Sequence, residues 1–243
     1  MSPDTRLRLL NLCSLGGFVA LGSTLAGWLI AGLLPLPLGP SDSQPEVFDF
    51  YTSDSTRRMI GFVLATVGIC FIFPLVGVIS MHMMRMEGRL PLLSFLQLGA
   101  GSVTMFINLL PSMLFAVLCF RPETRSAETI SLLNDVTWLI FFTPIMPFIF
   151  QNVAIGVAIL SDRRETFPRW VGYVNLLVAF AFVPDVLAYF FLSGPFGWNG
   201  VFVFWLALTA YSVFLVVMGV VTRRANAELV EASTAQPPVP AAA

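Results

Sequence analysis

Polar side chains that lie inside long apolar runs are the residues of this sequence best able to do chemistry. Asp185 is the first of them, because it directly follows Pro184 and lies seven residues before its apolar run ends at Leu192. In a helix this spacing places the carboxyl group roughly 10 Å from the end of the run. An aspartate at the centre of a bilayer costs about 2.5 to 3.5 kcal/mol on insertion scales, so it normally faces protein or water. We therefore take Asp185 as a candidate proton relay or ligand-binding residue.

Asn108 and Asp135 are the polar residues expected to lie near Asp185. Asn108 precedes Pro111 in another apolar run, and Asp135 stands at the outer end of a run that contains two further prolines. Proline removes a backbone donor and bends or breaks a helix, which frees carbonyl groups in the same region. The sequence thus predicts a small polar cavity that opens toward the outer face. The alternative is that all three side chains only hydrogen-bond between helices or to the freed carbonyl groups.

A methionine-rich segment holds the single histidine of the chain. Met81, His82, Met83, Met84 and Met86 combine thioether and imidazole groups, which suit Cu(I). Methionine is also a good helix former that fills gaps in a core, and one histidine cannot build a site with several imidazole ligands. These five residues are weak metal candidates; we expect no metal site here, and no cofactor is identified.

Sequence signatures of common enzymes are absent. The chain has no G-x-S-x-G, no H-E-x-x-H and no glycine-rich phosphate loop, so hydrolases, zinc proteases and nucleotide-binding enzymes have no support. A net charge of -1 also gives no basic surface for nucleic acid. These observations favour a protein that is not an enzyme and does not bind nucleic acid.

The elements that must position the polar residues are apolar and long. Hydrophobic residues make up 57% of the chain and charged residues 11%, whereas soluble domains carry about 25% charge. Six runs reach the length of about 20 residues that spans a bilayer, and none alternates like a barrel strand. We expect an all-α, polytopic integral membrane protein, a bundle of six transmembrane helices over residues 1–224, followed by a disordered cytoplasmic tail over 225–243. The expected helices are 9–34, 59–81, 92–120, 136–160, 170–192 and 201–221.

Arginine placement predicts the orientation. All 13 basic residues are arginine, and nine of them fall at the termini and in the even-numbered loops between the expected helices. The positive-inside rule places that side in the cytoplasm, so both termini are expected inside. An arginine-only basic complement is typical of a GC-rich genome, and we expect the cytoplasmic (inner) membrane of a bacterium.

The first expected helix repeats small residues four positions apart, a spacing that lets two helix backbones approach closely. The pattern leaves open whether the neighbour is another helix of this chain or another membrane subunit; beyond these, the expected partner is the lipid bilayer. The small residues are Gly16, Ala20, Ser23, Thr24, Gly27 and Ala31.

Three functions are compatible with these patterns. The first is a non-enzymatic accessory or assembly subunit of a membrane complex, favoured by the small-residue faces. The second is a small proton-coupled transporter that uses Asp185. The third is a membrane enzyme that acts on a lipid or hydrocarbon with a metal site supplied by a partner.

Overall fold

The chain folds as an all-α bundle in the computed structural model, which describes residues 1–235. Six helical segments are long and apolar enough to cross a membrane, which confirms the predicted fold class. Their bounds differ from the expected ones, because polar turns at both ends of several spans continue the helix. The six spans are Pro3–Ala31, Ser55–Glu87, Leu92–Leu118, Ala127–Ser161, Arg169–Tyr189 and Gly194–Ala232.

Several spans consist of more than one helical element. The α-helices are α1 (Pro3–Ser14), α2 (Gly16–Ala31), α3 (Gln44–Thr52), α4 (Ser55–Ile69), α5 (Ile72–Glu87), α6 (Leu92–Leu118), α7 (Ala127–Phe142), α8 (Met146–Ser161), α9 (Arg169–Ala181) and α10 (Leu206–Ala235). The short elements are the 3-10 turns η1 (Pro122–Thr124), η2 (Val183–Tyr189) and η3 (Gly194–Phe196), and the π-helical segment η4 (Val201–Trp205).

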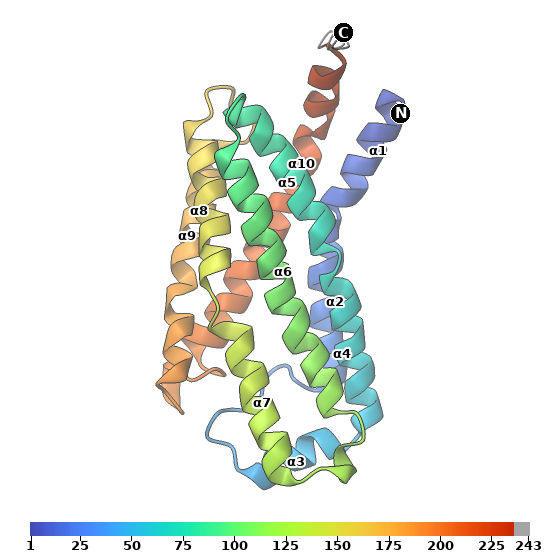
Figure 1. The fold of residues 1–243 in the computed structure, drawn as a ribbon, viewed down its shortest axis with the longest axis vertical. Helices are drawn as coiled ribbons and strands as arrows, with labels where there is room; N and C mark the ends of the chain where they lie inside the picture. Colours follow the sequence, from blue (N-terminus) through green and yellow to red (C-terminus); the bar gives the residue numbers. More distant parts are fainter. Residues whose placement is uncertain (236–243) are drawn as a thin grey trace, which may run out of the picture.

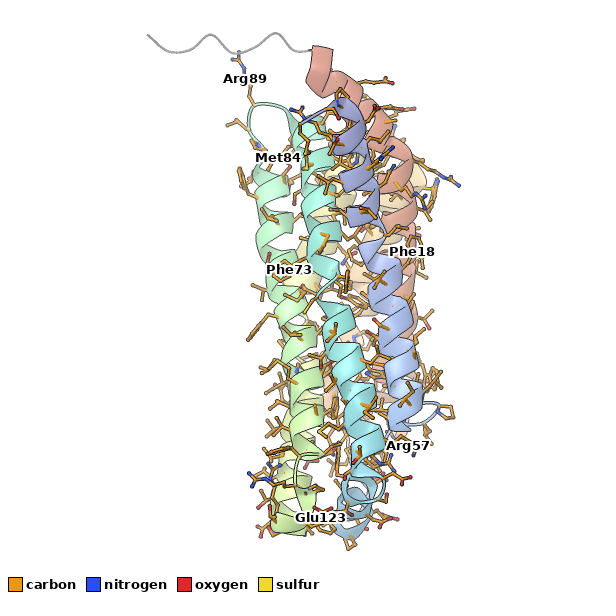
Figure 2. All side chains as sticks on the ribbon, turned by 90° about the vertical axis from the view of Figure 1, so that its right-hand side faces the viewer. Phe18, Arg57, Phe73, Met84, Arg89 and Glu123 are labelled. Carbon is orange, nitrogen blue, oxygen red and sulfur yellow. The ribbon has the colours of Figure 1, made fainter. Side chains whose placement is uncertain are left out.

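The spans run up and down along one long axis (Figure 1). Both termini lie at the same end of the bundle, which we call the termini end; α3 lies at the opposite end, which we call the cap end (Figure 1). Figure 2 shows Arg89 at the termini end and Arg57 and Glu123 at the cap end, with Phe18 and Phe73 between them. That the termini end faces the cytoplasm stays a prediction.

Four of the six spans are interrupted at half height. The breaks fall at Leu15, Cys70–Phe71, Thr143–Ile145 and Phe182, near the middle of each span. Proline explains three of them, because Pro74, Pro144 and Pro184 have no N–H to donate to the carbonyl four residues earlier. We call this level of aligned breaks the waist.

The apolar core is divided in two at the waist. One cluster, in the termini half, includes Ile79 and Met218; the other, in the cap half, includes Phe62 and Trp138. Phe182 is half-buried and packs against both clusters. The bundle is therefore two packed halves joined through the waist.

The cap end is closed by the α3 segment. Ser43 and Glu46 form a capping box at the start of α3, with the Ser43 N–H donating to Glu46 Oε2 at 2.8 Å. Arg58 anchors the segment: its Nη1 donates to the Ala31 carbonyl at 2.7 Å, and its guanidinium lies 3.8 Å from the Phe50 ring centre.

Gly27, Ala31 and Ser23 of the first span pack against α4 of the same chain, and Gly16 lies against Phe71 and Leu75 at the start of α5. A Cβ placed on Gly27 would lie 2.4 Å from the Gly61 carbonyl oxygen, and one on Gly61 would lie 2.4 Å from that of Gly27. Ala20 and Ala31 are buried, and Ser23 faces Gly68. The close neighbour of this stripe is thus another helix of this chain; an interface with other subunits remains a prediction.

The last helix extends beyond the predicted end of the membrane domain. α10 continues past Arg224 to Ala235, so residues 225–235, expected to be disordered, are helical. Asn226 in this stretch is fully buried between α1 and α5, which explains the extension. Residues 236–243 of the predicted tail lie outside the described residues.

Candidate functional site

A cavity lies at the waist, between the two halves of the core. It holds about 80 Å³ and is lined by residues of all six spans. Its walls combine residues of the termini-half cluster, such as Ile69 and Phe148, with residues of the cap-half cluster, such as Trp28 and Phe204. The aromatic side chains that line it are Trp28, Phe141, Phe142, Phe148, Phe182, Phe204 and Tyr211.

Four polar side chains line this largely apolar cavity, together with the indole N–H of Trp28, which is buried without a hydrogen-bond partner among the described residues. Thr104 donates its hydroxyl to the Ala100 carbonyl at 2.9 Å, and Asn108 Nδ2 donates to the Thr104 carbonyl at 2.8 Å. Thr24 lines the wall formed by α2, and the Tyr211 hydroxyl is buried without a hydrogen-bond partner among the described residues. An unpaired buried hydroxyl costs about 1 to 3 kcal/mol, so the Tyr211 hydroxyl is a group in need of a partner.

Backbone carbonyl groups without a helical hydrogen-bond donor also lie at the waist. Pro111 lies inside α6 and has no N–H for the carbonyl of Ile107, which lines the cavity. Pro144 likewise leaves the Ile140 carbonyl without its helical donor. Irregular backbone at membrane depth is tolerated where it is buried in protein or lines a cavity, and the waist satisfies that condition.

Asp185 lies one turn from the cavity, in η2. Its side chain is 1% exposed, and neither carboxyl oxygen has a hydrogen-bond partner among the described residues. Its N–H donates to the carbonyl of Phe182 at 3.1 Å, and Phe182 lines the cavity. An ionised carboxylate without partners in a low-dielectric interior carries a penalty of several kcal/mol, so this placement is costly whenever Asp185 is ionised.

The elements that pack against η2 supply no cation for Asp185. η3 and η4 contain no ionisable residue, and α7 contributes only the acidic Glu128 and Asp135. On α9 the ionisable residues are Arg169 and Tyr173, in its first turns. The nearest ionisable residue in sequence is Tyr189 of η2, whose hydroxyl accepts a hydrogen bond from Thr143 at 2.7 Å.

Asp135 belongs to the cap and not to the cavity. It is half-buried and accepts a hydrogen bond from Asn134 Nδ2 at 3.5 Å. Asn134 Oδ1 in turn accepts a hydrogen bond from the Tyr51 hydroxyl at 2.8 Å. Burial raises the pKa of Tyr51 well above its ordinary value. Of the three predicted residues, Asn108 lines the cavity, Asp185 lies next to a cavity residue, and Asp135 lies under α3.

The histidine of the methionine-rich segment is held in a polar network. His82 is fully buried; its Nε2 is 2.9 Å from Asn226 Oδ1, and its ring is 5.1 Å from that of Phe167. Met81 is exposed while Met83 is buried, so the methionines do not share one face. Within residues 1–235, no group of three His, Cys, Asp or Glu side chains could hold a metal ion.

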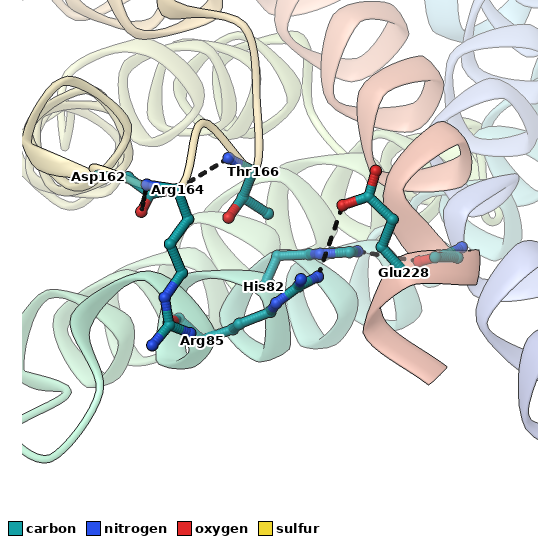
Figure 3. A network of polar contacts seen from close by, with 7 residues as sticks. His82, Arg85, Asp162, Arg164, Thr166 and Glu228 are labelled. Carbon is teal, nitrogen blue, oxygen red and sulfur yellow. Dashed lines mark hydrogen bonds and ion pairs between the residues drawn. The ribbon is translucent and has the colours of Figure 1, made fainter. Parts of the chain in front are cut away.

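A second polar cluster surrounds this histidine at the termini end (Figure 3). Arg85 lies 3.8 Å from Glu228 of α10, and Arg164 Nη1 donates to the Arg85 carbonyl at 3.3 Å. Asp162 is desolvated, but hydrogen bonds from Arg164 and Thr166 outweigh that effect and lower its pKa. These contacts link α5, the loop after α8 and α10 to one another.

The cavity residue that the sequence analysis missed is Tyr211. The available signal was a single tyrosine inside the last apolar run, which resembles an ordinary core aromatic until its hydroxyl is found without a partner. The aromatic walls could not be distinguished from core packing either, because composition does not show which residues surround a void.

Comparison with known proteins identified no relative of this chain. No family model matches the chain, and neither a curated protein nor a solved structure is similar to it. Its class therefore follows from the fold and the apolar spans: it is a multi-pass membrane protein.

Proposed function

We propose that the protein is a small proton-coupled carrier, in which Asp185 binds and releases a proton and the waist cavity takes up the solute. The observation that carries this proposal is a fully buried carboxyl group without partners, one turn from a cavity residue. Carboxyl groups inside membrane spans are rare and typical of proton pathways, since their burial is otherwise only a cost.

The divided core supports movement about the cavity. Carriers alternate access by rocking two packed units around a site near the bilayer midplane, often where helices are broken. Here the breaks, the cavity and the boundary between the two core clusters coincide. Phe182 packs against both clusters, so a change at Asp185 would act on the contact between the halves.

The other two functions have weaker support. The accessory-subunit hypothesis rested on the small residues of the first span, and Gly16, Ser23, Gly27 and Ala31 already pack against α4 or α5. The enzyme hypothesis needs ligands from a partner chain, because residues 1–235 hold no metal-binding group of their own. Both stay predictions.

A proton jump on proteoliposomes tests the carrier proposal without knowledge of the solute. The protein would be adsorbed on a solid-supported membrane and exposed to a step from about pH 10 to about pH 6. That step covers carboxyl groups whose pKa burial raises by about 3 to 5 units from about 3.9, and it leaves ordinary carboxyl groups ionised. We expect a transient charge displacement from proton binding in the wild type and its loss in Asp185→Asn.

Asp135→Asn is the matched control, because it removes a half-buried aspartate away from the cavity. It should retain the charge displacement, and thermal unfolding should show that both variants are folded. Equal signals from wild type and Asp185→Asn, or no signal above that of empty liposomes, would refute the proposal.

A further inference from the structure

We infer that the waist cavity binds a small uncharged molecule with an apolar, ring-sized body and one hydroxyl group, which pairs with the hydroxyl of Tyr211. This inference deepens the proposed function by naming the class of solute, and it rests on that proposal only in taking the cavity as the solute site.

The walls of the cavity select against charge. Among the described residues that line it, none is Asp, Glu, Arg or His, and most are aromatic or aliphatic. A charged ligand would lose its hydration there without a counter-ion, which disfavours its binding. The aromatic rings of Trp28, Phe142 and Phe148 instead offer edges and faces to an apolar body.

One wall of the cavity faces the side of the bundle from which such a ligand could enter. The cavity lies at half height of the bundle, and that wall is formed by Asn108, which is half-buried, and Pro144, which is exposed at the bundle surface. That side of the bundle borders hydrocarbon, where uncharged amphiphilic molecules concentrate. Ions from water do not reach this depth unaided.

Two buried polar groups that line the cavity are unpaired among the described residues: the Tyr211 hydroxyl and the indole N–H of Trp28, which can only donate. The Tyr211 hydroxyl is buried and unpaired, and it can both donate and accept. Asn108 uses one amide N–H on the Thr104 carbonyl, and its other amide hydrogen and its oxygen have no partner among the described residues. A ligand hydroxyl pairs with Tyr211 and satisfies a group that the protein alone leaves open.

The size of the cavity limits the body of the ligand. It holds about 80 Å³, whereas an apolar cavity of about 150 Å³ in another protein admits benzene. A single ring therefore fits only after half-buried wall side chains such as Leu21 and Leu208 turn outward. A larger body would need a still larger displacement of the walls.

Binding of fluorinated probes to the full chain in lipid nanodiscs tests the inference. 4-Fluorophenol, fluorobenzene and 4-fluorobenzoate differ in the hydroxyl and in charge, and fluorine NMR reports binding above that of empty nanodiscs. We expect 4-fluorophenol to bind more tightly than fluorobenzene and 4-fluorobenzoate not to bind. Tyr211→Phe should weaken 4-fluorophenol about fivefold to tenfold, the effect of one hydrogen bond, and leave fluorobenzene unchanged.

Tyr173→Phe is the matched control, since Tyr173 is 61% exposed on α9 and lies outside the cavity. Ala207→Leu, which fills the cavity, should remove binding of both neutral probes. Equal affinity of Tyr211→Phe and Tyr173→Phe for 4-fluorophenol, or binding no greater than in empty nanodiscs, would overturn the inference. Asp185→Asn should keep 4-fluorophenol binding while losing the proton signal, so failure of the inference and failure of the carrier proposal are distinguishable.

Discussion

The contact between Gly27 and Gly61 makes a quantitative prediction for the stability of the bundle. In Gly61→Ala the new Cβ would lie 2.4 Å from the Gly27 carbonyl oxygen and 2.7 Å from the Ala31 nitrogen. These obstacles are backbone atoms of a helix and cannot rotate away. Ordinary contact begins near 3.4 Å, so α2 and α4 must separate by about 1 Å.

The cost follows from the loss of packing along the two helices. A gap of 0.5 to 1 Å forfeits about a quarter to a half of each dispersion contact, and overpacking typically costs about 1 to 3 kcal/mol. Replacing a helical glycine by alanine also stabilises the helix by about 0.5 to 1 kcal/mol, because alanine has the higher helix propensity. Because both obstacles are backbone, we take the upper part of the overpacking range and expect a net loss of about 2 kcal/mol.

The assay is equilibrium unfolding in a mild detergent with added denaturing detergent, followed by tryptophan fluorescence. Gly22→Ala is the matched control, because it changes the same residue type in α2 where no atom lies within 4 Å of the new Cβ. We expect the control to be neutral or slightly stabilised. If Gly61→Ala and Gly22→Ala unfolded alike, the packing argument would be refuted; a change of oligomeric state without loss of stability would instead assign the stripe to a partner subunit.

Three further substitutions test the cap and the termini end by the same unfolding assay. Arg58→Met removes the charged donor to the Ala31 carbonyl and should cost about 2 kcal/mol; an unchanged midpoint would contradict this anchoring role. Tyr51→Phe leaves the buried Asn134 oxygen unpaired and should cost about 1 to 2 kcal/mol, and a neutral result would mean that water replaces the phenol. The pKa of Asp162 lies below its ordinary value of 3.8, so its contribution to stability is present above that pH and lost as pH falls through the lowered folded value. Asp162→Asn should therefore be less stable than wild type at pH 7, with the difference shrinking below pH 3.8; a difference independent of pH would contradict the ionic contribution.

The number of spans and the proline breaks follow from the sequence, whereas the positions that meet in space do not. Long apolar runs define membrane helices because the bilayer excludes charge, and Pro144 and Pro184 predict irregular backbone. The extension of α10 was not predictable, since Asn226 is polar. It becomes buried only because His82 Nε2 donates to its Oδ1 and its Nδ2 donates to Asn11 Oδ1. Hydropathy describes how readily each residue is buried by itself. It does not show which hydrogen-bond partners make the burial of a polar residue possible.

The helix breaks lie at the boundary between the two halves of the core. In the cap half, Gly27 and Gly61 bring α2 and α4 into backbone contact, and in the termini half a Cβ on Gly156 would lie 3.0 Å from the Gly172 carbonyl oxygen of α9. Each half is therefore held by close helix pairs that resist deformation. Between them the backbone is irregular, so the waist is the level at which the bundle can bend with least loss of packing. In the proposed carrier, a cavity at that level would change shape when the halves move. Asp185, whose N–H donates to the carbonyl of Phe182 at the junction, is the one buried acidic group among the described residues and would link its protonation to that movement.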